Sequence, residues 1–198
     1  MPSKTQSYSK PDFWSQKAFK EGYPARSVYK LAEIDKKFTF LKKNTSVLDL
    51  GAAPGSWTTW LLRNGAAKVV AVDLNPLSKS VTGENLTFIQ GDLLEQSTLT
   101  AIKEQGPYGL VVCDAAPLTT GNRVLDTARS QSLVEMAIWY AQEMLAQGGN
   151  FCVKIFQNGD QQKELKKMRE LFASAKGFKP EACRTTSFET YLIGLNKK

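Results

Sequence analysis

The apolar positions of the chain alternate between short continuous runs and longer stretches in which they recur at helical spacing. The short runs are rich in Val, Ile, Leu and Phe and end in turn residues, which predicts buried strands. They cover residues 46–51, 68–73, 86–92, 108–117 and 150–156. Helical spacing predicts helices at residues 27–38, 57–65, 97–106, 126–149 and 161–177. This alternation predicts an α/β fold, with helices on both faces of a mainly parallel sheet.

The remaining segment, residues 178–196, resembles a hairpin that closes the sheet. The chain shows no internal repeat and no low-complexity linker. Its 198 residues are enough for one well-buried core. We therefore expect a single domain over residues 26–198, preceded by a basic, aromatic arm at residues 1–25.

The composition excludes several kinds of chemistry. The chain contains no His, so a His general base, a His-dependent nucleophile and a His-ligated metal are all ruled out. Cys113, Cys152 and Cys183 are far apart in apolar stretches, which predicts buried, reduced thiols. No apolar segment approaches the ~18 residues of a membrane span, and the N-terminus does not resemble a signal peptide. We expect a cytoplasmic protein that needs no metal and no membrane.

The charge is divided unevenly along the chain. Residues 1–43 hold ten Lys and Arg against four Asp and Glu, and residues 154–198 hold ten against five. The middle segment, residues 44–153, holds six against ten. Basic ends favour a polyanionic partner such as nucleic acid, although they also serve simply to keep a protein soluble. Aromatic residues lie between the lysines of the arm and would offer bases a stacking surface: Tyr8, Phe13, Trp14, Phe19 and Tyr23.

A strand at 46–51 leads into a turn of small residues that opens a helix, which is where doubly wound folds bind ligands. The turn contains Gly51 and Gly55, but it matches neither the dinucleotide fingerprint nor a phosphate-binding P-loop. It carries the carboxylate of Asp49 and no positive charge. This arrangement favours a cationic ligand such as S-adenosylmethionine, which bears a sulfonium and an ammonium.

Two further carboxylates follow the next strands. Asp73 lies 22 residues after Gly51, where a carboxylate can accept hydrogen bonds from ribose hydroxyls. Asp92 follows the third strand and is placed to accept an adenine amino group. Either residue alone is typical of a turn or a helix cap. Together with Asp49 at one sheet edge, they favour a ligand site.

Four other residues have both a functional and an ordinary interpretation. Asp114 ends the fourth strand and belongs to the same edge of the sheet. Lys154 lies inside an apolar strand, which alone suggests an exposed charge on an edge strand. Lys30 alone suggests a solvated helix face, and Glu189 a charge at a strand end. An amine close to a carboxylate would instead suggest catalysis.

These features together resemble the FtsJ/RrmJ family of ribose 2'-O-methyltransferases, in particular bacterial members that methylate a uridine of large-subunit (23S) ribosomal RNA. The resemblance spans residues 12–196. It is carried by the segments 26–31, 49–57, 90–92, 114–117, 153–157 and 187–191. Two positions depart from the family pattern. Ser56 replaces a Gly found in many members, which a Ser at a helix N-cap would accommodate, and Phe188 replaces an expected Arg.

The resemblance implies a Rossmann-like, S-adenosylmethionine-dependent methyltransferase fold with a seven-stranded, mostly parallel sheet, so that residues 26–198 would form the methyltransferase domain. The catalytic residues that it implies are Lys30, Asp114, Lys154 and Glu189. The cofactor contacts that it implies are Gly55, Trp57, Asp73, Asp92 and Asp114. We add Gly51 of the turn to this set.

The expected mechanism places Lys154 beside the ribose hydroxyl, with two versions. In one, Lys154 is the base, its pKa lowered by the charge of Lys30 and by burial and opposed by Asp114. In the other, Lys154 stays charged and steers the oxygen lone pair, while the proton leaves to Asp114 or water. Glu189 would hold Lys30 or the ribose.

The expected partner is ribosomal RNA, within a large ribosomal subunit or its precursor, bound by a monomer. Three alternatives remain open from the sequence. The chain could modify a ribose in a tRNA anticodon loop, or it could be a non-catalytic RNA-binding factor in ribosome assembly. A nicotinamide-dependent oxidoreductase is the third alternative.

Overall fold

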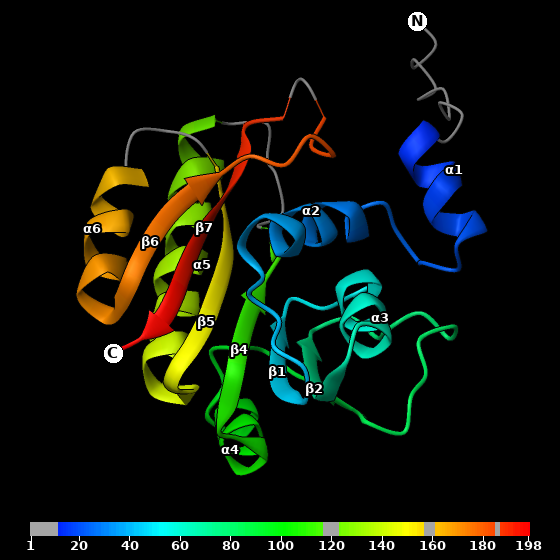
Figure 1. Ribbon diagram of the computed structural model, residues 1–198, viewed down its shortest axis with the longest axis horizontal. Helices are drawn as coiled ribbons and strands as arrows, with labels where there is room; N and C mark the ends of the chain where they lie inside the picture. Colours follow the sequence, from blue (N-terminus) through cyan, green and yellow to red (C-terminus); the bar gives the residue numbers. More distant parts are fainter. Residues whose placement is uncertain (1–11, 117–122, 157–160, 185–186) are drawn as a thin grey trace, which may run out of the picture.

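The computed structural model describes residues 12–116, 123–156, 161–184 and 187–198 (Figure 1). Tyr8 of the predicted arm and the motif residues Pro117 and Gln157 lie outside the described residues. The helices are α1 (Phe13–Lys20), α2 (Val28–Phe38), α3 (Ser56–Arg63), α4 (Gln96–Gln105), α5 (Arg123–Met144) and α6 (Gln161–Leu171). The strands are β1 (Thr45–Leu50), β2 (Ala66–Asp73), β3 (Leu86–Gln90), β4 (Tyr108–Cys113), β5 (Leu145–Phe156), β6 (Phe172–Phe178) and β7 (Glu189–Lys197).

The described strands form one seven-stranded sheet in the order β3-β2-β1-β4-β5-β7-β6. Strands β1 to β5 pair in parallel, and β7 runs antiparallel to both β5 and β6. This topology confirms the predicted Rossmann-like fold with a mostly parallel sheet. The strand order reverses between β1 and β4, and open α/β sheets bind ligands at such a point.

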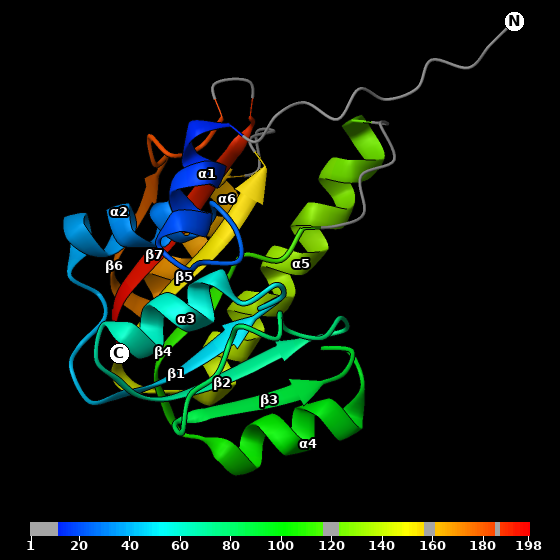
Figure 2. The ribbon, with the colours of Figure 1, turned by 90° about the vertical axis from the view of Figure 1, so that its right-hand side faces the viewer.

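Two apolar cores cover the two faces of the sheet. Leu48 and Leu50 of β1 belong to the core shared with α4, α5 and α6. Val47, on the same strand, belongs to the core shared with α2 and α3. Successive side chains of a strand point to opposite faces, so a strand that is covered on both sides must be apolar throughout. This requirement explains the continuous apolar runs in the sequence and confirms the predicted helices on both faces, which Figure 2 shows from the side.

The structure corrects two predicted helix ends. The helix predicted at 126–149 ends at Met144, and Leu145 already begins β5. The helix predicted at 161–177 ends at Leu171, because the next residues pair with β7 as strand β6. The ring of Phe172 stacks on Phe151 at 5.9 Å, so burial and strand pairing override a locally helical sequence there.

The described part of the predicted arm packs on the domain. Ala18 of α1 is fully buried, and the carboxylate of Asp12 accepts a hydrogen bond from the Ser15 amide and pairs with Arg26. The Tyr29 hydroxyl donates to Glu21 at 2.8 Å. These contacts place α1 beside α2 (Figure 1), while the boundary between residues 25 and 26 stays a prediction.

All three cysteines are free and buried, which confirms the predicted thiols. Among the described residues, no helix has the length and apolar character to cross a membrane.

Asn150 of β5 forms side-chain hydrogen bonds to the segment after α2 and to β7. Its amide nitrogen donates to the Phe40 carbonyl at 2.7 Å, and its oxygen accepts from the Asn196 amide at 3.0 Å. Asn150 is only 3% exposed and Phe40 is fully buried, so removal of the side chain would leave the buried Phe40 carbonyl without a partner. We predict that Asn150→Ala lowers the free energy of unfolding by about 1–3 kcal/mol, measured by urea titration. A change below about 0.5 kcal/mol would contradict this role.

Candidate active site

The carboxyl ends of β1, β2, β3 and β4 meet at one edge of the sheet, because these strands run parallel. Asp49 is the last but one residue of β1, Asp73 is the last residue of β2, and Asp114 directly follows β4. The fold therefore brings carboxylates from distant parts of the sequence to the same rim.

The turn after β1 depends on glycine at two positions. Gly51 has a φ of 71°, and a Cβ there would lie 2.6 Å from the Cβ of Ala115. Gly55 has a φ of 104° and is the N-cap of α3. The prediction that Ser56 serves as the N-cap is therefore wrong. The chain enters α3 through a left-handed residue, a conformation that Gly adopts readily and Ser does not.

Trp57 is buried at the start of α3 and ties three elements together. Its indole nitrogen donates to the Ser27 carbonyl at 2.9 Å, just before α2. Its ring lies 5.8 Å from that of Tyr191 on β7. Trp57 thus fixes the turn against the strand that carries Glu189.

The carboxylates of Asp73 and Asp92 hold turns of the rim. Asp73 accepts hydrogen bonds from the Ala53 amide at 2.9 Å and the Asn75 amide at 2.8 Å. Asp92 accepts one from the Leu94 amide at 2.9 Å. Both residues are half-buried, so their carboxylates also remain accessible from the rim.

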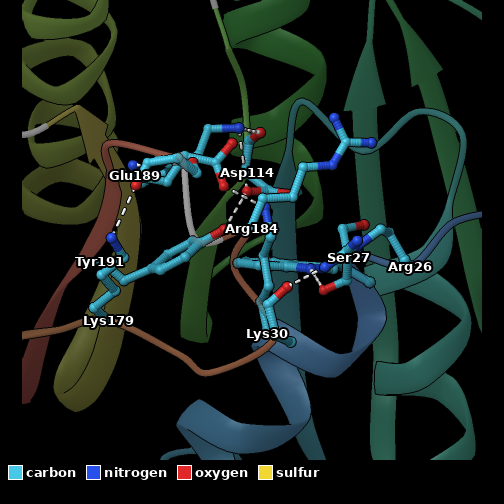
Figure 3. Close-up of polar contacts among 12 residues, drawn as sticks. Arg26, Ser27, Lys30, Asp114, Lys179, Arg184, Glu189 and Tyr191 are labelled. Atoms are coloured by element: carbon cyan, nitrogen blue, oxygen red, sulfur yellow. Dashed lines mark hydrogen bonds and ion pairs between the residues drawn. The ribbon is translucent and has the colours of Figure 1, made fainter. Parts of the chain in front are cut away.

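The structure brings the four predicted catalytic residues together from α2, the end of β4, β5 and β7. Figure 3 labels three of them, Lys30, Asp114 and Glu189. The ammonium of Lys154 lies 3.2 Å from the carboxylate of Asp114 and donates to the Asp114 carbonyl at 2.6 Å. The ammonium of Lys30 donates to the carboxylate of Glu189 at 2.6 Å. We call Lys30, Asp114, Lys154 and Glu189 the four-residue cluster.

Both lysines of the cluster are buried, which rules out their ordinary interpretations. Lys154 is 8% exposed on a strand that has β4 on one side and β7 on the other, so it is not an edge-strand charge. Lys30 is 9% exposed and shares the buried face of α2, so it is not a solvated helix charge. Buried lysines are uncommon unless they are paired, and both are paired here.

The electrostatics of the cluster keep Lys30 protonated. Burial alone lowers the pKa of Lys30, but the negative charges of Asp114 and Glu189 more than offset it and raise the pKa above its usual range. Lys30 therefore carries a full positive charge at neutral pH. Asp114 acts on both lysines, on Lys154 by contact and on Lys30 through its field.

Tyr191 is a fifth member of the site that the sequence analysis missed. Its hydroxyl donates to the Asp114 carboxylate at 2.7 Å. Burial and the negative charge of Asp114 raise the pKa of Tyr191 well above its usual range, so it remains a proton donor. Tyr191 faces Lys154 in the β5–β7 register and lies two residues after Glu189 on the same strand. The period of two along a strand is the sequence signal that would have identified it.

Basic side chains lie around the cluster (Figure 3). Arg26 donates to the Ala182 carbonyl at 2.6 Å, and Lys179 donates to the Ser187 carbonyl at 2.8 Å. Arg184 is largely exposed. We call Arg26, Lys179 and Arg184 the basic mouth of the site. The carboxylate of Asp12 pairs with both arginines and offsets part of their positive charge.

A small cavity of about 30 Å³ lies between the turn and the cluster. Its lining residues come from the start of α2, the end of β1, the turn and the end of β4: Ser27, Asp49, Gly51, Ala52, Ala53, Pro54, Ser56, Trp57 and Asp114. This set contains two carboxylates and neither Lys nor Arg. Among the described residues, no group of three or more Cys, Asp and Glu side chains is arranged to hold a metal ion.

Asp49 is the fully buried carboxyl of this cavity. One of its oxygens accepts a hydrogen bond from the Thr58 hydroxyl at 2.6 Å. The other oxygen has no partner among the described residues. Burial raises the pKa of Asp49 to about 7; the Thr58 bond opposes the shift, and the charges of Asp114 and Asp73 add to it.

Comparisons with known proteins agree with this geometry. The FtsJ-like methyltransferase family matches residues 23–197. A Treponema denticola protein named ribosomal RNA large subunit methyltransferase E is 61% identical, over 96% of this chain and 97% of its own. A protein of the same name from Oleidesulfovibrio alaskensis is 45% identical, over 94% and 92%. The crystal structure of a Plasmodium falciparum ribosomal RNA methyltransferase superposes with a TM-score of 0.76 at 26% identity, over 88% of this chain and 98% of that one.

The raised pKa of Asp49 makes stability depend on pH. In the unfolded chain this carboxyl ionises near pH 3.8, whereas in the folded protein it keeps its proton up to about pH 7. Folding is therefore increasingly opposed as the pH rises between these values, and the full cost is present above pH 7. We predict that Asp49→Asn raises the free energy of unfolding at pH 8 by up to about 4 kcal/mol, and by less at pH 5. Urea titrations of both proteins at the two pH values measure this; an equal gain at both would refute it.

Proposed function

The chain belongs to the FtsJ-like methyltransferase family, and from this membership we propose that it transfers a methyl group from S-adenosylmethionine to a ribose 2'-hydroxyl of ribosomal RNA. The observation that carries the proposal is the four-residue cluster, with its two buried lysines, beside the carboxylate-lined cavity. The relatives that share 61% and 45% of the sequence over nearly the whole chain bear the name of a large-subunit ribosomal RNA methyltransferase.

The residues of the rim fit a cationic cofactor. The cavity is lined by the carboxyls of Asp49 and Asp114, and one buried oxygen of Asp49 has no partner in the described part of the chain. Phosphate-binding sites need positive charge or a glycine-rich P-loop, and this cavity lining provides neither. The residues that would hold the cofactor are Gly51, Gly55, Trp57, Asp73, Asp92 and Asp114. When bound, it supplies a methyl group already activated by the positive sulfur.

The chain's own residues then have to orient the ribose hydroxyl and provide a route by which its proton leaves. Two of the three N–H bonds of Lys154 are directed to the carbonyl and carboxylate of Asp114, which leaves the third for the hydroxyl oxygen. The contact with the Asp114 carboxylate at 3.2 Å favours the version in which Lys154 steers the lone pair. The hydroxyl proton leaves to Asp114 or to water.

Lys30 and Glu189 act as a charged pair that borders the reacting groups. Glu189 fixes the ammonium of Lys30 at 2.6 Å, and that ammonium stabilises the negative charge on Asp114. Tyr191 donates to the same carboxylate and limits its rotation. Asp114 is thereby held in place beside Lys154.

The substrate we propose is a uridine of large-subunit (23S) ribosomal RNA, within the large subunit or its precursor. The names of the relatives support this choice over a tRNA anticodon loop. The complete cluster argues against a non-catalytic assembly factor. All four side chains come from one chain, so one copy is enough to form the cluster, and the state that we propose is a monomer. Free, buried cysteines are consistent with the proposed cytoplasmic location.

The RNA would approach over the basic mouth of the site and α1. Phe13 and Phe19 of α1 are exposed, and Lys17 and Lys20 lie on the same helix. Exposed aromatic rings next to lysines suit stacking with bases and contact with phosphates. This surface includes the described part of the predicted arm.

We predict that Lys154→Met abolishes methyl transfer, with a loss of at least about 100-fold, because the substituted side chain cannot orient the hydroxyl. Cofactor affinity should stay nearly unchanged, because Lys154 does not line the cavity. A tritiated methyl-transfer assay on ribosomal particles, free ribosomal RNA and tRNA measures the loss and identifies the substrate. Normal turnover in this variant would disprove both versions of the mechanism.

We also predict that Lys17→Ala combined with Lys20→Ala weakens RNA binding and flattens its salt dependence. Each lost phosphate contact on single-stranded RNA lowers the slope of log K against log salt by about 0.7. Binding measured between low and moderate salt tests this. The matched control is Lys163→Ala with Lys166→Ala on α6, at the opposite end of the molecule (Figure 1). Equal slopes for the two double variants would count against an RNA surface on α1.

A further inference from the structure

The buried carboxyl of Asp49 has an oxygen that the described protein does not satisfy. The residue is fully buried near the end of β1, and Thr58 of α3 supplies a hydrogen bond to one oxygen only. A buried polar atom without a partner costs about 1–3 kcal/mol, and more when it is charged. The oxygen therefore needs either a proton of its own or a donor that enters the adjoining cavity.

The ionisable groups around Asp49 do not supply a positive partner. The carboxylates of Asp73 on β2 and Asp114 on β4 both disfavour its ionisation. Cys113 on β4 is neutral, because burial raises the pKa of its thiol to about 12. The ammonium of Lys154 on β5 is directed to Asp114, and that of Lys30 on α2 to Glu189. A cation at Asp49 must therefore come from a ligand.

We propose that Asp49 exchanges a proton for the positive charge of S-adenosylmethionine: its carboxyl is protonated in the free protein and ionised in the complex. This inference rests on the proposed function. The carboxyl loses its proton to solvent as the cation enters, and no other bond changes. Asp49 is thus a binding residue in addition to those that the family resemblance implies.

Proton exchange at Asp49 makes cofactor affinity depend on pH. A cation that needs the ionised carboxyl competes with the proton, so binding weakens as the pH falls below the value of about 7 at which free Asp49 titrates. The expected loss is about tenfold between pH 8 and pH 6, since each unit below the pKa reduces the ionised fraction about tenfold. Near pH 6 the complex should release close to one proton for each bound molecule.

Isothermal titration calorimetry of the full chain with S-adenosylmethionine, in buffers of different ionisation enthalpy, measures both quantities between pH 6 and pH 8. Wild type and the control Glu104→Gln, an exposed carboxyl on α4, should show the tenfold change and the proton release. Asp49→Asn should lose the weakening of affinity below pH 7 and should release no proton near pH 6, where the amino group of the cofactor is itself fully protonated. Adenosine, which has no cationic group, should release none from wild type.

Thr58→Val provides a second variant that does not alter the carboxyl itself. The Thr58 hydroxyl favours ionisation of Asp49, so its removal should move the midpoint of the pH dependence upward. Tight binding of S-adenosylmethionine with no pH dependence and no proton release would overturn the role of Asp49 and leave the proposed function intact. Absence of binding at every pH would instead overturn the cofactor of the proposed function, and this inference with it.

Discussion

The arrangement of the site depends on the interactions that the carboxylate of Asp114 makes with its neighbours. It pairs with Lys154 at 3.2 Å, accepts the hydroxyl of Tyr191 at 2.7 Å and raises the pKa of Lys30 through its field. These partners come from α2, β5 and β7, so one side chain after β4 organises three other elements. The topology makes this possible, because β4 lies next to β5 and β7 pairs with β5 on the far side.

Taking two lysines and two carboxylates out of water is costly, and paired charges recover that cost only with good geometry. The sheet provides that geometry. Lys154 and Tyr191 are direct neighbours in the β5–β7 register, and Trp57 fixes the cofactor turn against both α2 and β7. The cluster is thus held rigidly by the cores on either side of the sheet, as is needed to align a weak nucleophile with an activated methyl group.

Much of the fold followed from the sequence, because strands buried on both faces must be continuously apolar and parallel strands require intervening helices. The same rule placed Asp49, Asp73 and Asp114 at one edge. The end of the helix at Leu171 was not predictable, since β6 forms only through pairing with β7. The burial of the two lysines was not predictable either. Lys30 depends on Glu189, which lies more than a hundred residues away in the sequence, and Lys154 is buried because β5 lies inside the sheet. Tyr191 was not singled out from the sequence, although its spacing from Glu189 puts both residues on one face of β7.

The central claim is that this cluster directs methylation of a ribose in large-subunit ribosomal RNA. Mass-spectrometric mapping of ribose methyl groups in cells from which the gene has been deleted tests it most directly. The account predicts that one 2'-O-methyluridine of the large-subunit RNA disappears, and that the wild-type gene restores it. Unchanged large-subunit RNA, or loss of a ribose methyl group from tRNA instead, would contradict it.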